Sequence, residues 1–415
     1  MSNYDAIVIG AGHNGLTNAA YLAKSGLKVM VLEKNDYIGG AAVSRELHDG
    51  WTYSNCSYVC SLLRPEIYRD LNLQKHGLQV LAYGGSVTFM KNGDIFGGYS
   101  DHDVARREIG RFSKKDADAY ERFSRDVSRQ CRFIKPLLLR TPPDPTSFKP
   151  KDLSELLFLF KRLYGLGEET IYDTIRFYTM SVAEYLEEYF ESDVVKAALS
   201  GSGIIGTGLG PYSPGTAYVL LHHYMGEVDG NIGSWGFARG GMGAVSNALA
   251  GALKEHSGEI KTNSEVSQII VKNGRATGVV LANGDEHYAK NIVSNLDVKR
   301  TYQKLFDQND LNEKIIKQVD NFKIRGSSGK LNIALDGLPD FPAMGKNNPL
   351  MTADMHFIDS LERMERAFDD WKNGRWSRDP YCDTLIPTLT DPTMAPPGKH
   401  YMSVFVQYAP PKLAT

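Results

Sequence analysis

The chain has 415 residues, of which 42% are hydrophobic and 23% are charged. This composition is that of an ordinary globular protein, so it excludes a disordered chain, a collagen and a small disulfide-stapled protein. The 47 basic and 49 acidic residues leave a net charge of -2, which provides no basic field for nucleic acid. The length suggests two or three domains.

Three further features predict a soluble cytoplasmic protein. The longest compact apolar run, Leu156–Phe160, is far shorter than the roughly 18 to 20 residues of a membrane span. The N-terminus has no sequence of basic, apolar and cleavage regions, which a secretory signal requires. Four cysteines in a chain of this size are typical of a reducing compartment rather than of a disulfide framework.

The first forty residues predict a strand, a helix and a second strand, with a glycine turn after the first strand. Ala6–Ile9 is an apolar run that suits a buried parallel strand. A helix is expected from Asn14 to Ser25, with Gly26 as its C-terminal stop, and Val29–Leu32 forms the next strand.

A second ordered unit is predicted in the middle of the chain. Met242–Glu255 has helical spacing, and Val266–Lys272 and Arg275–Ala282 are predicted strands. Asn273-Gly274 between these strands is a strong signal for a two-residue hairpin turn. Ile292–Asn295 follows as a short strand, so a three-stranded meander is expected to lead back to the parallel sheet.

The remaining regions differ in amino-acid composition and in their predicted structure. Val104–Tyr189 predicts a helical insertion, interrupted by an exposed proline loop at Pro142–Pro145. Residues 200–243 are rich in glycine and are expected to form loops over a site. From Thr301 onward we expect alternating short strands and loops, with a last strand at Tyr401–Tyr408.

The apolar segment Leu153–Tyr164 permits two interpretations. Its leucine and phenylalanine side chains, together with Lys161 and Arg162, are compatible with contact at a bilayer surface. Packing in the core of the helical region is favoured, because the apolar residues cover too much of the helix for a clean amphipathic stripe.

A glycine turn with an acidic partner carries the clearest chemical signal. Gly10, Gly12 and Gly15 form a G-x-G-x-x-G pattern between the first strand and the first helix. These glycines permit a tight turn, close approach of the backbone to a diphosphate, and close packing of the helix on the strand. The helix N-terminus adds free N–H groups and the positive end of the helix dipole. Glu33 ends the second strand, where a carboxylate can bind a ribose diol, so a dinucleotide is predicted.

The residues after Glu33 favour FAD over a nicotinamide dinucleotide. Gly39 and Gly40 are followed by Ala41-Ala42, and a glycine pair here lets the chain double back beneath a diphosphate and ribitol. Lys34 is a candidate phosphate ligand, although a solvated surface position is the favoured interpretation.

These motifs together resemble the glutathione-reductase-type FAD fold, and within it the branch shared by amine oxidases and phytoene desaturases. The segment from Gly240 to Asn295 is similar to that branch as well. The resemblance implies an α/β fold, with a Rossmann-like FAD-binding domain and a mixed-sheet plus helical substrate domain. It assigns residues 1–100 and 230–300 to the FAD-binding domain, and residues 101–229 and 301–415 to the substrate domain.

Three segments narrow the resemblance to one group of the phytoene-desaturase-like proteins, the pyridine nucleotide-disulfide oxidoreductase domain-containing proteins. These segments are Cys60–Tyr68, Tyr218–His223 and Trp235–Met242, and the likeness covers essentially the whole chain. For eukaryotic relatives, the resemblance implies the mitochondrial matrix. Members continue into a C-terminal glycine-rich segment that closes over the flavin. This sequence has no Gly-Gly pair after Gly241 and stops at Thr415, so we expect the last part of the FAD domain to be missing.

The resemblance also implies a set of cofactor contacts, in which the backbone of Val266 brackets the adenine of FAD. The predicted FAD-binding residues are Gly10, Ala11, Gly12, Asn14, Gly15, Glu33, Lys34, Gly39, Gly40, Ala41 and Val266.

The predicted function is that of a FAD-dependent oxidoreductase that transfers a hydride between a hydrophobic small molecule and the flavin. The alternative is a non-catalytic or regulatory flavin-fold protein that acts by binding a partner, as the Rab GDP-dissociation inhibitors do on this architecture. The complete set of glycines and Glu33 favours the enzyme. Nucleic acid is not expected as a partner, whereas peripheral membrane contact and an unidentified protein partner remain open.

His222 and His223 are the candidate catalytic residues, because they follow an apolar run in the glycine-rich region. A structural role is the favoured alternative for either, and at most one of two neighbours should face the flavin. Trp235 is expected either to shield the ring or substrate or to pack in the core. Arg64 is expected to cap or lie at the surface rather than to pair with a phosphate or an acidic substrate group.

A redox disulfide and a metal site are not expected. Cys56 and Cys60 are separated by three residues, whereas a flavin disulfide reductase of this superfamily has four between its redox cysteines, so ordinary buried thiols are favoured. No histidine, cysteine or aspartate cluster has the sequence spacing of metal ligands, so the predicted metal is none.

Overall fold

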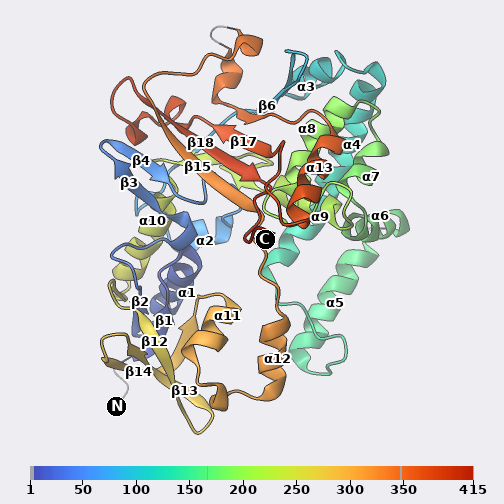
Figure 1. Ribbon diagram of the computed structural model, residues 1–415. Helices are drawn as coiled ribbons and strands as arrows, with labels where there is room; N and C mark the ends of the chain where they lie inside the picture. Colours follow the sequence, from blue (N-terminus) through green and yellow to red (C-terminus); the bar gives the residue numbers. More distant parts are fainter. Residues whose placement is uncertain (1–3, 166, 346–347, 415) are drawn as a thin grey trace.

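The computed structural model describes residues 4–165, 167–345 and 348–414. Figure 1 shows one sheet at the lower left, a second sheet at the top and a group of helices at the right. The first sheet has the strand order β11 (Glu259–Lys261), β2 (Val29–Leu32), β1 (Tyr4–Ile9), β14 (Glu286–Ser294), β13 (Arg275–Leu281) and β12 (Val266–Lys272).

The first sheet is built around β1, which is parallel to both β2 and β14. Helices α1 (His13–Lys24) and α10 (Gly243–Glu255) cover one face, where alanines such as Ala19 and Ala248 allow close packing. The other face of β1 and β2 packs against β12, β13 and the first half of β14, where Ile7 and Leu32 meet Val279. Both faces of β1 and β2 are therefore buried, as their uninterrupted apolar runs predict.

The predicted meander is confirmed, and β14 explains how it leads back to the parallel sheet. The first half of β14 pairs antiparallel with β13, and its second half pairs parallel with β1. Asn273 and Gly274 both have positive φ, 51° and 72°, which is the backbone that a type I′ hairpin turn requires.

The second sheet brings together strands from distant parts of the chain. Its order is β15 (Ser328–Leu335), β18 (His400–Gln407), β17 (Tyr381–Leu385), β16 (Asp354–His356), β6 (Ser86–Phe89) and β7 (Ile95–Gly98). The pairing of β6 with β16 places residues 86–98 in this sheet, although residues 1–100 were assigned to the FAD-binding domain. The division of the chain into two domains otherwise stays a prediction.

Three short antiparallel pairs of strands lie outside the two six-stranded sheets within the described residues. They are β3 (Ser44–His48) with β4 (Trp51–Ser54), β5 (Val80–Ala82) with β10 (Gly236–Ala238), and β8 (Glu227–Val228) with β9 (Asn231–Ile232).

The predicted helical insertion, Val104–Tyr189, forms a bundle with its own core around Phe123, and two helices that follow it in the sequence join this core. Its helices are α3 (His102–Ile109), α4 (Lys114–Ile134), α5 (Pro150–Tyr164), α6 (Glu168–Thr179), α7 (Val182–Glu187), α8 (Asp193–Ile204) and α9 (Thr216–Tyr224). Outside the bundle lie α2 (Pro65–Asp70), α11 (Val298–Arg300), α12 (Glu313–Asn321) and α13 (Leu361–Lys372).

Two sequence expectations about loops are wrong. Residues 216–224 form α9 rather than a loop, because Ala217, Leu220 and Leu221 lie on a face that the bundle core buries. The region after Thr301 contains α12 and α13 as well as strands; α13 begins at its N-cap Ser360 and buries an apolar face that includes Trp371.

The expectation that Leu153–Tyr164 packs in the core is also wrong. Every residue of α5 is exposed or half-buried, and Leu153, Leu157, Phe160 and Tyr164 are among the exposed large hydrophobic residues. Among the described residues, no helix has the length and apolarity that crossing a bilayer requires.

Candidate functional site

The glycine turn and the Gly39-Gly40 pair lie against each other. Gly12 and Gly39 form an isolated parallel bridge, and a Cβ added to Gly40 would lie 3.1 Å from the Cα of Gly12. A Cβ added to Gly15 would lie 2.3 Å from the carbonyl oxygen of Gly10, so only glycine permits the helix to start this close to the strand. We call Gly10–Gly15, Glu33 and Gly39-Gly40 the glycine cradle.

The carboxylate of Glu33 lies at the mouth of the turn. Its Oε2 accepts a hydrogen bond from the Ala11 N–H at 2.9 Å, and its Oε1 accepts from the N–H and the Nδ2 of Asn35 at 3.0 and 2.9 Å. A carboxylate has about four acceptor positions, so one position remains for a ribose hydroxyl.

The groups of the cradle fit a dinucleotide. Within the described residues, Gly12 is the N-cap of α1 and no side chain caps this helix, so the N–H groups of its first turn are available for a diphosphate. The glycines of the turn carry no side chains, and the side chain of Asn295 lies against it, with Nδ2 3.0 Å from the position that a Cβ of Gly12 would occupy. The cradle therefore offers N–H donors for the diphosphate and a carboxylate acceptor for the ribose. These are the groups that a dinucleotide such as FAD needs.

The other predicted contact residues surround the cradle. Ala11 is buried, whereas Asn14, Lys34 and Ala41 are exposed. Val266 begins β12 and is buried, and the nearby Ser264 N–H donates to the carbonyl of Glu33. Their roles as ligands stay predictions.

The segment after β4 connects the cradle to the second sheet. The Ser57 N–H donates to the carbonyl of Ala41 at 3.0 Å. One residue later, the Tyr58 hydroxyl donates to Oδ2 of Asp383 on β17 at 2.6 Å. The cradle and the second sheet are therefore joined by direct contacts through neighbouring residues.

The second sheet turns polar side chains inward. The register places His356 opposite Asp383, Asp383 opposite Phe405, and Phe405 opposite Lys330, so these residues share one face. A strand with one polar and one apolar face usually buries the apolar face. β15 does the opposite, because Leu331 on the other face is 54% exposed while Lys330 is half-buried. We call the face that carries Lys330, Asn332, Asp354, His356, Asp383 and Ser403 the polar face.

Lys330 is the cation of the polar face. Its Nζ donates to Oδ1 of Asn332 at 3.0 Å, contacts the hydroxyl of Ser403, and lies 5.1 Å from the centre of the Tyr58 ring. Burial lowers the pKa of Lys330 to about 8, because a poorly hydrated ammonium is disfavoured. A lysine in this state can hold or release a proton near neutral pH.

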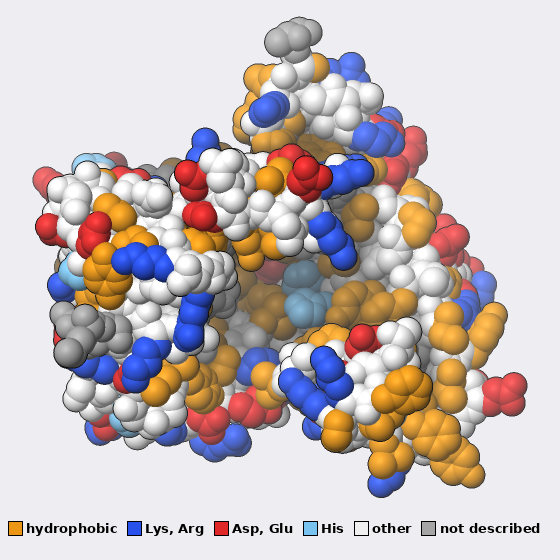
Figure 2. All heavy atoms as spheres, turned by 90° about the horizontal axis from the view of Figure 1, so that it is seen from below, with side chains coloured by type: hydrophobic (Ala, Val, Ile, Leu, Met, Phe, Trp, Pro, Cys, Tyr) orange, Lys and Arg blue, Asp and Glu red, His pale blue; other side chains and the backbone are white. Residues whose placement is uncertain are grey.

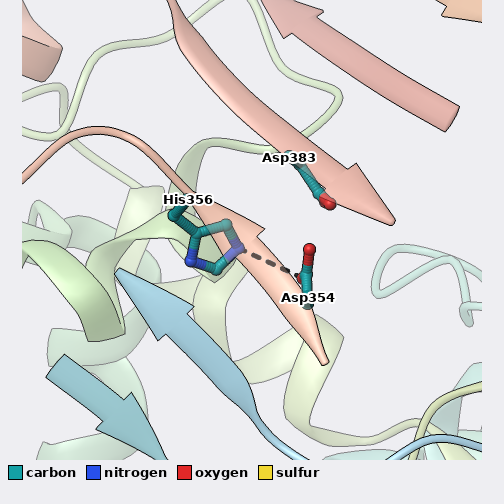
Figure 3. Close-up of side chains that lie close together, drawn as sticks. All are labelled: Asp354, His356 and Asp383. Carbon is teal, nitrogen blue, oxygen red and sulfur yellow. Dashed lines mark ion pairs between the residues drawn. The ribbon is translucent and has the colours of Figure 1, made fainter. Parts of the chain in front are cut away.

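Figure 3 shows Asp354, His356 and Asp383 pointing toward one another from β16 and β17. Burial raises the pKa of Asp354 to about 6, and burial together with the charge of Asp354 holds the pKa of Asp383 well above its usual range. Burial lowers the pKa of His356. The cluster therefore favours neutral groups unless a cation is present.

The two candidate catalytic histidines face different surroundings on α9. His222 is half-buried and lines a cavity of about 240 Å³ together with Arg64 and Lys135. His223 stacks on Trp235 with ring centres 5.8 Å apart, and its Nδ1 lies 2.9 Å from the Val219 carbonyl oxygen. Burial lowers the pKa of both histidines. Neither arrangement assigns a catalytic role, so both stay predictions.

The face of the molecule seen from below in Figure 2 is hollowed at its centre, with hydrophobic and histidine side chains on the floor of the hollow.

Arg64 lies at the N-cap of α2, and its Nε is 3.6 Å from Oε2 of Glu66. Cys60 is buried, and burial raises the pKa of its thiol to about 11. Cys56 is exposed rather than buried as expected.

The polar face is the part of the site that the sequence did not reveal. Its residues come from β15, β16, β17 and β18, and none belongs to a recognised motif. One signal was present: Lys330 and Asn332 alternate with Leu331 and Ile333, which marks a strand with one polar and one apolar face. That alternation does not say which face is buried.

Comparisons with known proteins agree with this architecture. A protein of Mus musculus called pyridine nucleotide-disulfide oxidoreductase domain-containing protein 2 is 36% identical, over 99% of this chain and 74% of its own length. The chloroplastic prolycopene isomerase of Daucus carota is 30% identical, over 97% of this chain and 61% of its own length. A solved structure of a putrescine oxidase triple mutant is similar in fold, with a TM-score of 0.59 and 15% identity over 98% of this chain and 75% of that one.

The predicted fold class and the resemblance are confirmed. Residues 15–407 match the family described as flavin containing amine oxidoreductase, which also supports FAD as the cofactor. The chain therefore belongs to the family of flavin-containing amine oxidoreductases.

Proposed function

We propose that this protein is a FAD-dependent oxidoreductase that transfers a hydride between a small hydrophobic molecule and the flavin. The observation that carries the proposal is the path of contacts from the glycine cradle through Ala41, Ser57 and Tyr58 to Asp383. When bound, FAD supplies a ring that takes or gives a hydride. The path joins residues that fit FAD to buried residues that can hold a proton.

The residues of the chain divide this work. The glycine cradle binds the diphosphate and the ribose, which fixes the cofactor in place. The Tyr58 hydroxyl and the Lys330 ammonium lie together on the polar face, where they can orient a substrate or move a proton. Stacked aromatic pairs, Tyr58 with Phe405 and Tyr83 with Phe237, add apolar surface to this region.

A hydrophobic substrate is supported by two observations. The carrot relative is named for its action on prolycopene. The cavity beside His222 is lined in part by Leu62, Leu63, Leu138 and Met225, which offer an apolar surface to a small molecule.

A direct experiment tests the function. The purified protein is saturated with FAD, its visible spectrum is recorded, and it is screened anaerobically against apolar alkenes, amines and alcohols. We expect at least one class to bleach the flavin absorbance. A colourless protein that does not take up FAD would contradict the proposal and would favour a partner-binding role.

We also propose that α5 contacts an anionic bilayer surface. Leu153, Leu157 and Phe160 are exposed on this helix, and its last turn carries the exposed Lys161. Exposed apolar side chains beside cations suit the interface of an anionic membrane.

Replacement of one apolar side chain tests this contact. We expect the protein to float with phosphatidylglycerol vesicles, and we expect Phe160→Glu to reduce the bound fraction about tenfold, because a buried Phe contributes roughly 1.5 to 3 kcal/mol. Leu47→Glu is the matched control, since Leu47 is exposed on β3. Equal flotation of both variants, or no flotation of the wild type, would contradict the contact.

A further inference from the structure

Three potential ligand groups meet on the polar face. The ligand atoms of Asp354, His356 and Asp383 all lie within 4.8 Å of one another, and Nε2 of His356 is 3.1 Å from Oδ2 of Asp354. Figure 3 shows the two carboxylates facing each other beside the imidazole ring. Asp383 is 3% exposed and His356 is 7% exposed, so water does not solvate them freely.

The hydrogen bonds of the cluster are incomplete. Oδ2 of Asp383 accepts from Tyr58, but Oδ1 of Asp383 and Oδ1 of Asp354 have no hydrogen-bond partner among the described residues. Nε2 of His356 is likewise without one, because its contact with Asp354 lacks hydrogen-bond geometry. Buried polar atoms without partners are destabilising. These three atoms are therefore satisfied best by a group placed between them.

Among the described residues, no hydrogen bond runs from Lys330 to any of these three atoms. Lys330 is already bound to Asn332 and Ser403. One proton shared by the two carboxyl groups would join their free oxygens, but it would leave Nε2 of His356 without a partner. A cation between the three side chains satisfies all three atoms at once.

We propose that Asp354, His356 and Asp383 bind a divalent first-row transition-metal ion, with Zn²⁺ the ion that best matches the donors. One imidazole nitrogen and two carboxylates are ligand types that Zn²⁺ takes. The two carboxylate charges balance the charge of the ion. Three protein ligands leave a position open for water or for a substrate oxygen. The Asp354 side chain is 16% exposed, which gives the ion a route into the cluster.

Metal titration of the purified protein tests this site. After treatment with EDTA and dialysis, Zn²⁺ is titrated in by calorimetry, and we expect about one tightly bound ion for each chain. His356→Gln and Asp383→Asn should weaken this binding about 100-fold or more, because even residues that only support metal ligands contribute 10- to 100-fold. Asp336→Asn and His102→Gln are the matched controls, since both residues are exposed, and they should bind as the wild type does.

The melting temperature and the FAD content are measured as well. Zn²⁺ should raise the melting temperature of the wild type and of the controls, but not that of the ligand variants. If Asp383→Asn does not fold, Asp354→Asn replaces it, because Asp354 is partly exposed. A wild type without tight Zn²⁺ binding, or ligand variants that bind like the controls, would overturn the site. The FAD content is measured in parallel and is expected to stay constant, so failure of the metal site is separate from failure of the proposed function.

Discussion

Gly12→Val is expected to give a folded protein that no longer retains FAD. The backbone of Gly12 has φ -70° and ψ 163°, an extended conformation that valine adopts readily. Strain at the turn is therefore not the reason for the expected loss. A Cβ at this position lies 3.9 Å from the Cα of Gly40, so the valine methyl groups would occupy the approach between the two glycine segments.

The expected effect is large, because this approach is where the diphosphate meets the backbone. Affinity for FAD should fall at least about 100-fold, which corresponds to roughly 2.7 kcal/mol. The bound flavin is measured from the visible spectrum after gel filtration, and the melting temperature checks the fold. The same Cβ lies 3.0 Å from Nδ2 of Asn295, so that side chain must shift by a few tenths of an ångström.

Gly12 is chosen because a side chain at the other glycines of the cradle would disturb the backbone itself. Gly10 and Gly40 have φ of +94° and +57°, so a side chain there would strain the backbone whether or not FAD binds. A side chain at Gly15 would collide with the Gly10 carbonyl. Cys56→Ser is the control, because this exposed thiol is expected to leave the flavin content unchanged. Normal flavin content in Gly12→Val would show that the diphosphate does not lie at this turn.

The glycine cradle could be predicted because its signals are local. Gly10, Gly12 and Gly15 lie within six residues, and the strand and helix that flank them have clear apolar patterns. Glu33 ends the next strand, so a parallel β-α-β unit alone brings its carboxylate to the turn. The contact between Glu33 and Ala11 follows from this topology.

The polar face could not be predicted because its residues meet only through strand order. Lys330, His356 and Asp383 come from three strands, and β18, which joins two of these strands, follows all three in the sequence. Single-sequence patterns do not reveal such pairings. The sequence spacing of metal ligands was absent for the same reason, since Asp354 and Asp383 are neighbours in space through β16 and β17.

The errors in the helices have different physical reasons. Residues of α9 were expected to form a loop because glycines surround them, yet tertiary burial of Leu220 and Leu221 stabilises the helix. In α13 the helical signal was present, since Leu361, Met364 and Phe368 recur at helical spacing. In α5 the helix was expected, but the sequence did not show that its apolar residues would lie outside the core.

Lys330→Met is expected to impair electron transfer while FAD remains bound. Lys330 lies over the ring of Tyr58, and Tyr58 is the residue after Ser57, which contacts Ala41 beside the glycine cradle. A cation so placed would stabilise the negative charge of a reduced flavin whose ring is held beside Tyr58. Methionine keeps most of the length of the side chain but removes the charge.

Two measurements report this change. The rate of flavin reduction, with a substrate found in the anaerobic screen, should fall about 10²- to 10⁴-fold, the range for loss of a group that moves a proton. Independently of any substrate, the two-electron midpoint potential at pH 7 should fall by about 30 to 60 mV, where 30 mV is about 1.4 kcal/mol. Lys399→Met is the matched control, because Lys399 pairs with Asp336 at the surface.

The pH dependence separates a charge effect from a packing effect. Because the pKa of Lys330 is lowered to about 8, its side chain is charged below that pH and neutral above it. The difference in midpoint potential between wild type and Lys330→Met should therefore be largest near pH 7 and should disappear as the pH rises through about 8 toward 10. A difference that stays constant across this range would mean that methionine acts by altering the packing around Tyr58, and that the ammonium of Lys330 does not set the midpoint potential.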